Sequence, residues 1–182
     1  MTDDPLDTPS VELSRLFHLA EFTDVPEHEI TITASEAECD ELAARYSLLS
    51  LDALSAQLTI RQEIGGEIVV KGCLHAELVQ ACVVTLEPVR DTLEATFDQR
   101  YTVDSVDIED DLEIGPDDME PPEPVIGDSI DLGELVAQYL FLSINPYPRA
   151  PEAEAQSAEI ASKTEDEGPF AALAQLRDRD KN

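Results

Sequence analysis

The sequence predicts an α+β protein that is mainly β, with a curved antiparallel sheet or half-open barrel, two packing helices and a flexible C-terminal tail. Apolar and polar residues alternate over 54–61 and again over 68–78, the period of strands with one buried face. Gly65 and Gly66 between these runs suit a tight hairpin. Two capping patterns each precede an apolar stripe at helical spacing, at about 35–47 and 131–145.

Further strands are expected on both sides of this hairpin. Residues 28–33 alternate, and an apolar stretch at 11–22 precedes them as another strand. The second strand of the hairpin is expected to run on through Val84, before a turn near Pro88. A long strand then carries its apolar set on one face, at Leu93, Ala95, Phe97, Tyr101 and Val103.

Each helix has a start signal in the sequence. Ser35 with Glu38 has the spacing of a capping box, and Asp131 with Glu134 repeats it. The second helix should end before Pro146, since proline cannot continue a helix.

The chain divides by composition into four parts. Residues 1–10 are polar and expected to be flexible, and 11–148 form a single domain with an acidic loop at 104–123. Residues 149–168, rich in Ala and Glu, are expected to be a disordered tether. A short helical motif is expected at 169–177, with Pro169 at its start.

Charge restricts the class of partner. The 182 residues include 41 Asp and Glu against 11 Lys and Arg, a formal charge of −30. Nucleic-acid binding depends on clustered Lys and Arg, so direct contact with nucleic acid is not expected. Complementary potentials favour a basic protein, although such a charge can also serve solubility and the monomeric state alone.

Other compositional features favour a cytoplasmic monomer with reduced thiols. No run of 18 apolar residues occurs, and the first ten residues contain no apolar leader segment. The three cysteines, Cys39, Cys73 and Cys82, are odd in number and widely spaced, which argues against a disulfide framework.

We find no pattern that predicts catalysis, a cofactor or a metal. Cys73 and His75 share a strand face and would be the pair for a thiol enzyme, but the strand alternation already accounts for them. Asp107, Glu109 and Asp111 alternate as in a calcium loop, yet Gly115 stands too far on. The protein is therefore expected to hold a partner and to be no enzyme.

Two stretches are candidate partner-binding sites. The acidic loop presents Asp110, Asp111, Asp117 and Asp118 to a basic partner. The terminal motif places Phe170, Leu173 and Leu176 on one helix face, a spacing used to anchor a helix in a groove. The alternative is that this motif folds back onto the protein's own sheet.

Several motifs together resemble one protein family. They are the 80–89 stretch QACVVTLEPV, a following strand, the acidic insert with prolines, the 130–136 stretch IDLGELV, and PFAALAQL at 169–176. In this order they resemble the YceD family of large ribosomal RNA subunit accumulation proteins, and the form at Cys82 is most similar to its alphaproteobacterial branch. The resemblance implies a role in the synthesis or accumulation of large-subunit ribosomal RNA and in ribosome assembly, with no known enzymatic activity.

The chain departs from the family at its cysteines. Many members carry a cysteine three residues after the first and another after the proline-rich helix end, where this chain has Thr85 and the 148–150 region. Cys82 is then expected to pack as a small apolar side chain. The expected partner is a basic ribosomal protein or an assembly factor. The alternative is direct RNA binding, which requires Arg61, Lys71, Arg90 and Arg100 to gather on one sheet face.

Overall fold

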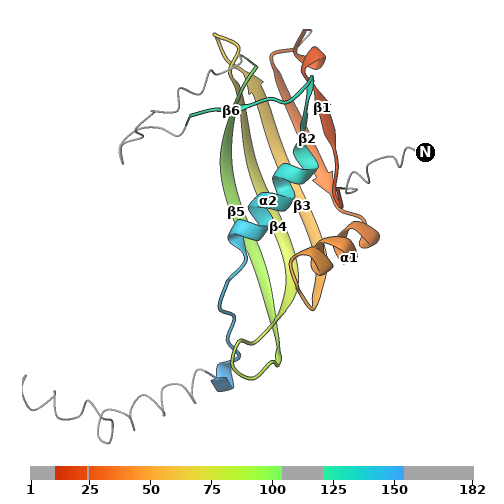
Figure 1. The fold of residues 1–182 in the computed structure, drawn as a ribbon, viewed down its shortest axis with the longest axis vertical. Helices are drawn as coiled ribbons and strands as arrows, with labels where there is room; N and C mark the ends of the chain where they lie inside the picture. The colour runs from red at the N-terminus through yellow and green to blue at the C-terminus, as the bar shows by residue number, and fades with distance from the viewer. Residues whose placement is uncertain (1–10, 24, 104–120, 154–182) are drawn as a thin grey trace, which may run out of the picture. The chain divides into compact units, whose positions relative to one another are not determined.

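The structure is a computed structural model, and it describes residues 11–23, 25–103 and 121–153. The chain forms two compact units. One comprises Met1–Val79 with Arg90–Ile144, and the other comprises Gln80–Val89 with Asn145–Asn182. The larger unit holds the sheet and both α-helices (Figure 1). Neither described helix is long and apolar enough to cross a membrane.

A five-stranded sheet, in the order β2-β3-β4-β5-β6, forms the frame of the larger unit. Its strands are β2 (Glu27–Thr33), β3 (Ser50–Gln62), β4 (Ile68–Ala81), β5 (Pro88–Thr102) and β6 (Glu123–Pro124). The fold is mainly β, as predicted, and β3 and β4 form the predicted antiparallel hairpin. Gly65 and Gly66 have φ angles of 112° and 88° in its turn, values that residues with a side chain rarely adopt.

The sheet is not closed into a barrel, which agrees with the first of the two predicted forms, an open sheet covered by helices. The sheet is also mixed, since β6 runs parallel to β5. A parallel neighbour needs a long connection from β5, and the acidic stretch between the two strands supplies that length.

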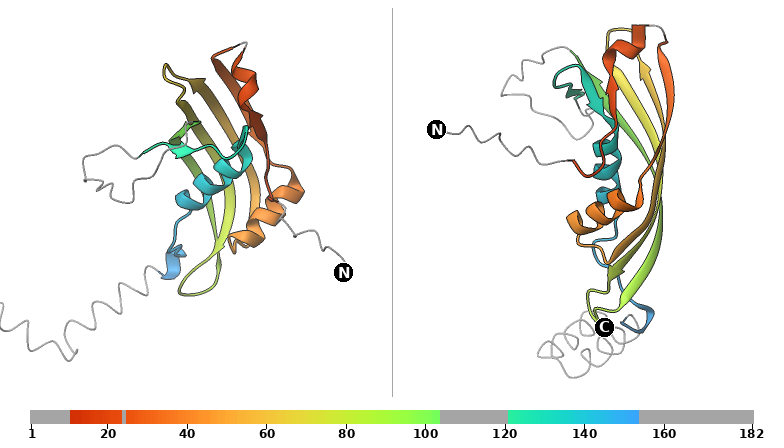
Figure 2. Two further views of the ribbon diagram at one scale, coloured as in Figure 1. Left: turned by 45° about the horizontal axis from the view of Figure 1, so that its top comes forward. Right: turned by 90° about the vertical axis from the view of Figure 1, so that its right-hand side faces the viewer.

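The two predicted helices are present, and they cover one face of the sheet (Figure 2). Helix α1 (Glu36–Arg45) begins with a complete capping box, in which Ser35 and Glu38 each bond the other's backbone amide. Helix α2 (Leu132–Ser143) is capped by Asp131, which accepts from the amides of Gly133 and Glu134. The Glu134 side chain does not complete a box, because it pairs with Arg45 at 2.7 Å.

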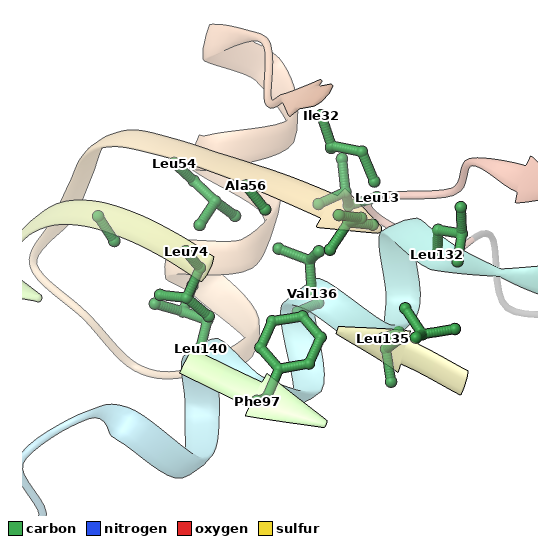
Figure 3. Packing of buried hydrophobic residues seen from close by; sticks show 14 of the residues in the cluster. Leu13, Ile32, Leu54, Ala56, Leu74, Phe97, Leu132, Leu135, Val136 and Leu140 are labelled. Atoms are coloured by element: carbon green, nitrogen blue, oxygen red, sulfur yellow. The ribbon is translucent and has the colours of Figure 1, made fainter. Parts of the chain in front are cut away.

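The core lies between this helical layer and the sheet. Figure 3 shows Val136 and Leu140 of α2 directed toward the side chains of the strands. Both residues are fully buried, as is Leu74 on β4. The alternation in β3 and β4 therefore has the predicted sense, with the apolar set under the helices and the polar set on the opposite, outer face.

The N-terminal stretch differs from its prediction. Instead of a full strand it contains β1 (Leu16–His18) and a 3-10 helix, η1 (Leu19–Thr23). Strand β1 pairs antiparallel with β7 (Ser129–Asp131), which leads directly into α2. The irregular apolar spacing at Leu16, Phe17, Leu19 and Phe22 matches no strand period, and Phe17 and Phe22 are the buried pair, in edge-to-face contact at 5.1 Å.

Close backbone approach fixes this N-terminal stretch against α2. A Cβ on Gly133 would lie 2.6 Å from the Leu13 carbonyl oxygen, so glycine is required at this contact. Arg15 forms a two-pronged ion pair with Glu38 at 2.8 and 3.0 Å, which ties the same stretch to α1. Both helices are thus fastened to a segment that lies far away in sequence.

A second close contact shapes the middle of the sheet. The Phe97 ring lies over Gly72, where a Cβ would come within 2.2 Å of the ring, and it stacks on Tyr139 of α2 at 4.1 Å. The missing side chain on β4 therefore makes room for an aromatic contact between β5 and α2.

Candidate partner-binding surface

The predicted binding residues lie outside the described residues. They are the acidic Asp110, Asp111, Asp117 and Asp118, and the apolar Phe170, Leu173 and Leu176. Both sets stay predictions, and so do the tether and the terminal helix.

The two ends of the acidic stretch, however, are placed. The stretch leaves the sheet after Thr102 of β5 and returns at β6, where Tyr101 pairs with Glu123 and Thr102 with Pro124. The Val125 amide bonds the Thr102 carbonyl at 2.9 Å. The sequence from Asp104 to Glu123, which holds ten acidic residues, therefore begins and ends at the same edge of the sheet.

The four cations that direct RNA binding would require lie on the outer face or at its margins, but each has a carboxylate partner. Register places Lys71 opposite Thr59, and Arg61 opposite Val69. The four pairs are Arg61 with Glu63 at 2.6 Å, Lys71 with Asp98 at 3.5 Å, Arg90 with Asp52 at 3.1 Å and Arg100 with Glu67 at 2.7 Å. The cations and their partners sum to zero formal charge, which differs from the unbalanced patch that phosphate binding uses.

A groove of about 630 Å³ crosses the outer face over β2 to β5. Its lining is mixed: polar Thr31, Gln57, Thr59, Cys73 and Thr96, apolar Ile30, Leu58 and Phe97, and the charged pair Glu29 and Lys71. The charges of Glu29 and Lys71 cancel, so the groove carries little net charge.

Cys73 and His75 lie on this outer face, as the alternation of side chains along β4 predicts. They lie opposite Gln57 and Ser55 of β3. Cys73 is exposed, and the nearest ionic partner of His75 is Glu77, with Nε2 and Oε1 3.8 Å apart. A thiol nucleophile needs a base within hydrogen-bonding distance, and in the described chain no hydrogen bond joins Cys73 to His75.

The smaller unit is built around Cys82, whose side chain is buried with Ala150 and Ala153. The prediction that Cys82 packs as a small apolar residue is incomplete. Its Sγ also accepts hydrogen bonds from the amides of Val84 and Thr85, both at 3.4 Å, and of Ala150 at 3.3 Å. The sulfur thereby joins the 80–89 turn to the 145–153 segment.

These contacts favour the thiolate. A hydrogen bond from the Thr85 side chain, followed by those from the Ala150 and Thr85 amides, lowers the pKa of the Cys82 thiol to about 7. The cause is the concentration of donors on one sulfur, with no cation among them.

The same contacts bring Cys82 together with Thr85 and Ala150. Thr85 and Ala150 both donate to Cys82, so these positions are neighbours in space. In this chain they offer one sulfur, and the described residues contain no group of three His, Cys, Asp or Glu that could hold a metal ion. A structural zinc site needs about four ligands, so the residues present do not fit one.

Sequence reasoning missed the exposed apolar residues of this turn. Strand β4 ends at Ala81 and not at Val84, and the exposed side chains include Val83, Val84, Leu86 and Tyr147. Leu86 has a φ of 62°, a turn conformation that apolar periodicity cannot reveal.

Comparison with known families gives one match. A family model described as large ribosomal RNA subunit accumulation protein YceD matches residues 70–177. This chain belongs to the YceD family. The match spans β4 to α2 and the Cys82 turn, and so contains the motifs that carried the resemblance. No curated protein and no solved structure matches the chain.

The structure extends the YceD domain beyond the matched range. Strands β2 and β3 and helix α1 precede residue 70, yet they supply the core residues Ile32, Leu54 and Leu42. The match does not distinguish an alphaproteobacterial branch, so that part of the resemblance stays a prediction.

Proposed function

We propose that this YceD protein is a non-enzymatic factor for the accumulation of large-subunit ribosomal RNA, and that it acts by binding a basic ribosomal protein or maturation factor. Membership of the family supports the first part, because its description names large ribosomal RNA subunit accumulation. The distribution of charge supports the second part.

One observation carries the choice of partner. The cations that lie on the outer face or at its margins each pair with a carboxylate, while the ends of a stretch with ten acidic residues are fixed beside β5. The surplus charge of the chain is thus negative, and the stretch of sequence in which it is densest begins and ends at the β5 edge of the sheet. A surface of this kind repels a phosphate backbone and attracts Lys and Arg side chains.

The factor would then affect the accumulation of large-subunit ribosomal RNA through a protein that it binds. A basic ribosomal protein kept soluble or delivered by this factor would limit assembly when the factor is absent, and unassembled RNA would fail to accumulate. Direct RNA binding would instead require the four ion pairs to open, and each opening leaves a carboxylate near the phosphates.

The experiment is affinity purification of the full tagged chain from cells, with and without nuclease, at low and at high salt. We expect a basic protein to be retained at low salt after nuclease treatment and released at high salt, because screening shortens the range of surface charges. Recovery of ribosomal RNA from protein-stripped extracts, with no protein partner after nuclease, would contradict the proposal.

A further inference from the structure

We propose that the free edge of β5, residues 90–96, accepts an extended basic segment of the partner as an additional strand. This inference rests on the proposed function and names where and how the partner binds. It follows from three properties of the edge: its unpaired backbone, the apolar side chains on its inner side and the acidic groups around it.

The backbone of this edge has no neighbouring strand among the described residues. Strand β5 pairs with β4 on one side, whereas on the other side the described β6 lies beside it at Tyr101 and Thr102. A strand edge with unpaired amides and carbonyls is a template for a further strand.

The direction of the unpaired groups can be derived. The Thr102 carbonyl bonds the Val125 amide on the β6 side, so backbone groups of alternate residues, Glu94 and Thr96 among them, also point to that side. Burial alternates from Pro88 to Asp98, and Phe97 and Tyr101 are both buried at an even spacing, which argues against a bulge between Glu94 and Thr102. The Thr92 amide bonds the Asp91 carboxylate at 2.8 Å, as expected for a donor without a strand partner.

The two sides of the edge differ in character. On the inner side, Leu93 and Ala95 are half-buried against the core and offer apolar surface to an added strand. On the outer side, Glu94 and Asp98 are exposed. A fitting segment therefore alternates, with small apolar residues inward and Lys or Arg outward.

Charge around the edge favours this occupant further. The cation on this stretch, Arg90, is engaged by Asp52 at 3.1 Å, and Arg100 beyond it is engaged by Glu67. The exposed Glu94 lies within this stretch and the exposed Glu123 of β6 lies beside the end of β5, and both carboxylates attract a basic segment. Neither feature would favour a neutral or acidic strand.

The test uses the full chain and a ten-residue peptide of alternating Lys and Val. A Lys and Pro peptide of equal length and charge serves as its control, because proline has no amide hydrogen for a ladder. We expect the Lys and Val peptide to bind at least tenfold more tightly. Equal affinities would overturn the proposal, since they would mean attraction by charge alone.

A matched pair of variants tests the edge itself. Thr96→Pro removes an amide that points away from β4, whereas Thr96→Ala keeps it. We expect at least tenfold weaker peptide binding for Thr96→Pro and less than a twofold change for Thr96→Ala. Equal binding by the two variants would overturn the proposal.

Hydrogen exchange on the unaltered protein covers the case in which Thr96→Pro does not fold. Saturating Lys and Val peptide should slow exchange at the amides of Glu94 and Thr96 at least tenfold, and unchanged exchange there would overturn the proposal. Purification from cells separates the two proposals. If a folded Thr96→Pro variant retains a basic partner, edge docking is refuted and the proposed function still stands. If the unaltered chain retains no basic partner, the proposed function is refuted.

Discussion

The Asp131 carboxylate accepts the backbone amide of Arg15 at 2.8 Å, which joins residues 116 positions apart in sequence. The same side chain accepts from the Ser14 hydroxyl at 2.6 Å and caps α2 through the amides of Gly133 and Glu134. One carboxylate thus begins a helix and fixes the N-terminal stretch that the helix packs against.

This shared role predicts a large effect of Asp131→Ala. Loss of a helix cap costs about 1 kcal/mol, and the unpaired Arg15 amide adds about 1–2 kcal/mol, so we expect about 2–3 kcal/mol less free energy of unfolding. Urea unfolding measures it. Asp128→Ala, at an exposed neighbouring position, is the control, and equal losses for the two variants would contradict the role of Asp131.

Glu38 predicts a dependence of stability on pH. The Arg15 side chain, followed by the Ser35 amide, lowers the pKa of Glu38 to about 2, against an ordinary value of 4.5. A carboxyl with a lowered folded pKa stabilises the fold above its ordinary pKa, and this contribution is lost as the pH falls toward 2.

We therefore expect Glu38→Gln to reduce the free energy of unfolding by about 1–2 kcal/mol near pH 7. The gap from the unaltered protein should close between pH 5 and pH 2, as seen by urea unfolding across pH. Glu36→Gln, in the same first turn, is the control. A gap for Glu38→Gln that stayed constant with pH would show that the loss is not one of charge.

Cys82 predicts a trend of the same sign at higher pH. Its pKa is lowered to about 7 from an ordinary 9.0, so the stabilisation by the thiolate is complete above pH 9 and is lost as the pH falls through 7. The stability gap between the unaltered protein and Cys82→Ala should widen from pH 7 to pH 9. Cys39→Ala is the control, because burial raises the pKa of the Cys39 thiol. A Cys82→Ala gap that did not widen would mean that the sulfur stays protonated.

The terminal segment provides a prediction in cells. If Phe170, Leu173 and Leu176 anchor the partner, replacing all three by Ser should abolish the main protein crosslink found by mass spectrometry. Replacing Ala171, Ala172 and Ala174 by Ser should leave that crosslink in place. Retention of the crosslink in the Phe170, Leu173 and Leu176 variant would restrict binding to the ordered domain.

Local signals predicted most of the fold. Ser35 and Asp131 start the two helices, and alternation from Leu54 to Leu78 gives the correct buried face, because each feature depends on neighbours within a few residues. The parallel β6 could not be predicted in this way, since Tyr101 meets Glu123 only through a long connection.

The candidate site was less predictable. The alternation of side chains along the strand correctly placed Cys73 and His75 on the outer face. It could not show that Lys71 and Arg100 are paired with carboxylates on other segments. The stretch of β5 that has no neighbouring strand in the described part of the chain is likewise a property of strand order, to which no single stretch of sequence refers. The resemblance at Cys82 predicted the family, and the three amides around its sulfur are visible in the structure alone.

The central claim is that surplus acidic charge at one edge recruits a basic protein for large-subunit assembly. The most direct measurement replaces Asp110, Asp111, Asp117 and Asp118 by Asn in cells and compares this chain with a second variant. That control neutralises the same number of acidic residues elsewhere, at the exposed positions Glu29, Glu36, Asp40 and Glu41.

The readouts are the ratio of large-subunit to small-subunit ribosomal RNA and the amount of basic protein that copurifies after nuclease treatment. We predict that both fall severalfold in the first variant and stay near normal in the control, because the four Asp lie in the stretch tethered beside β5. A fall in the RNA ratio with the basic protein still bound, or equal losses in both variants, would contradict the account.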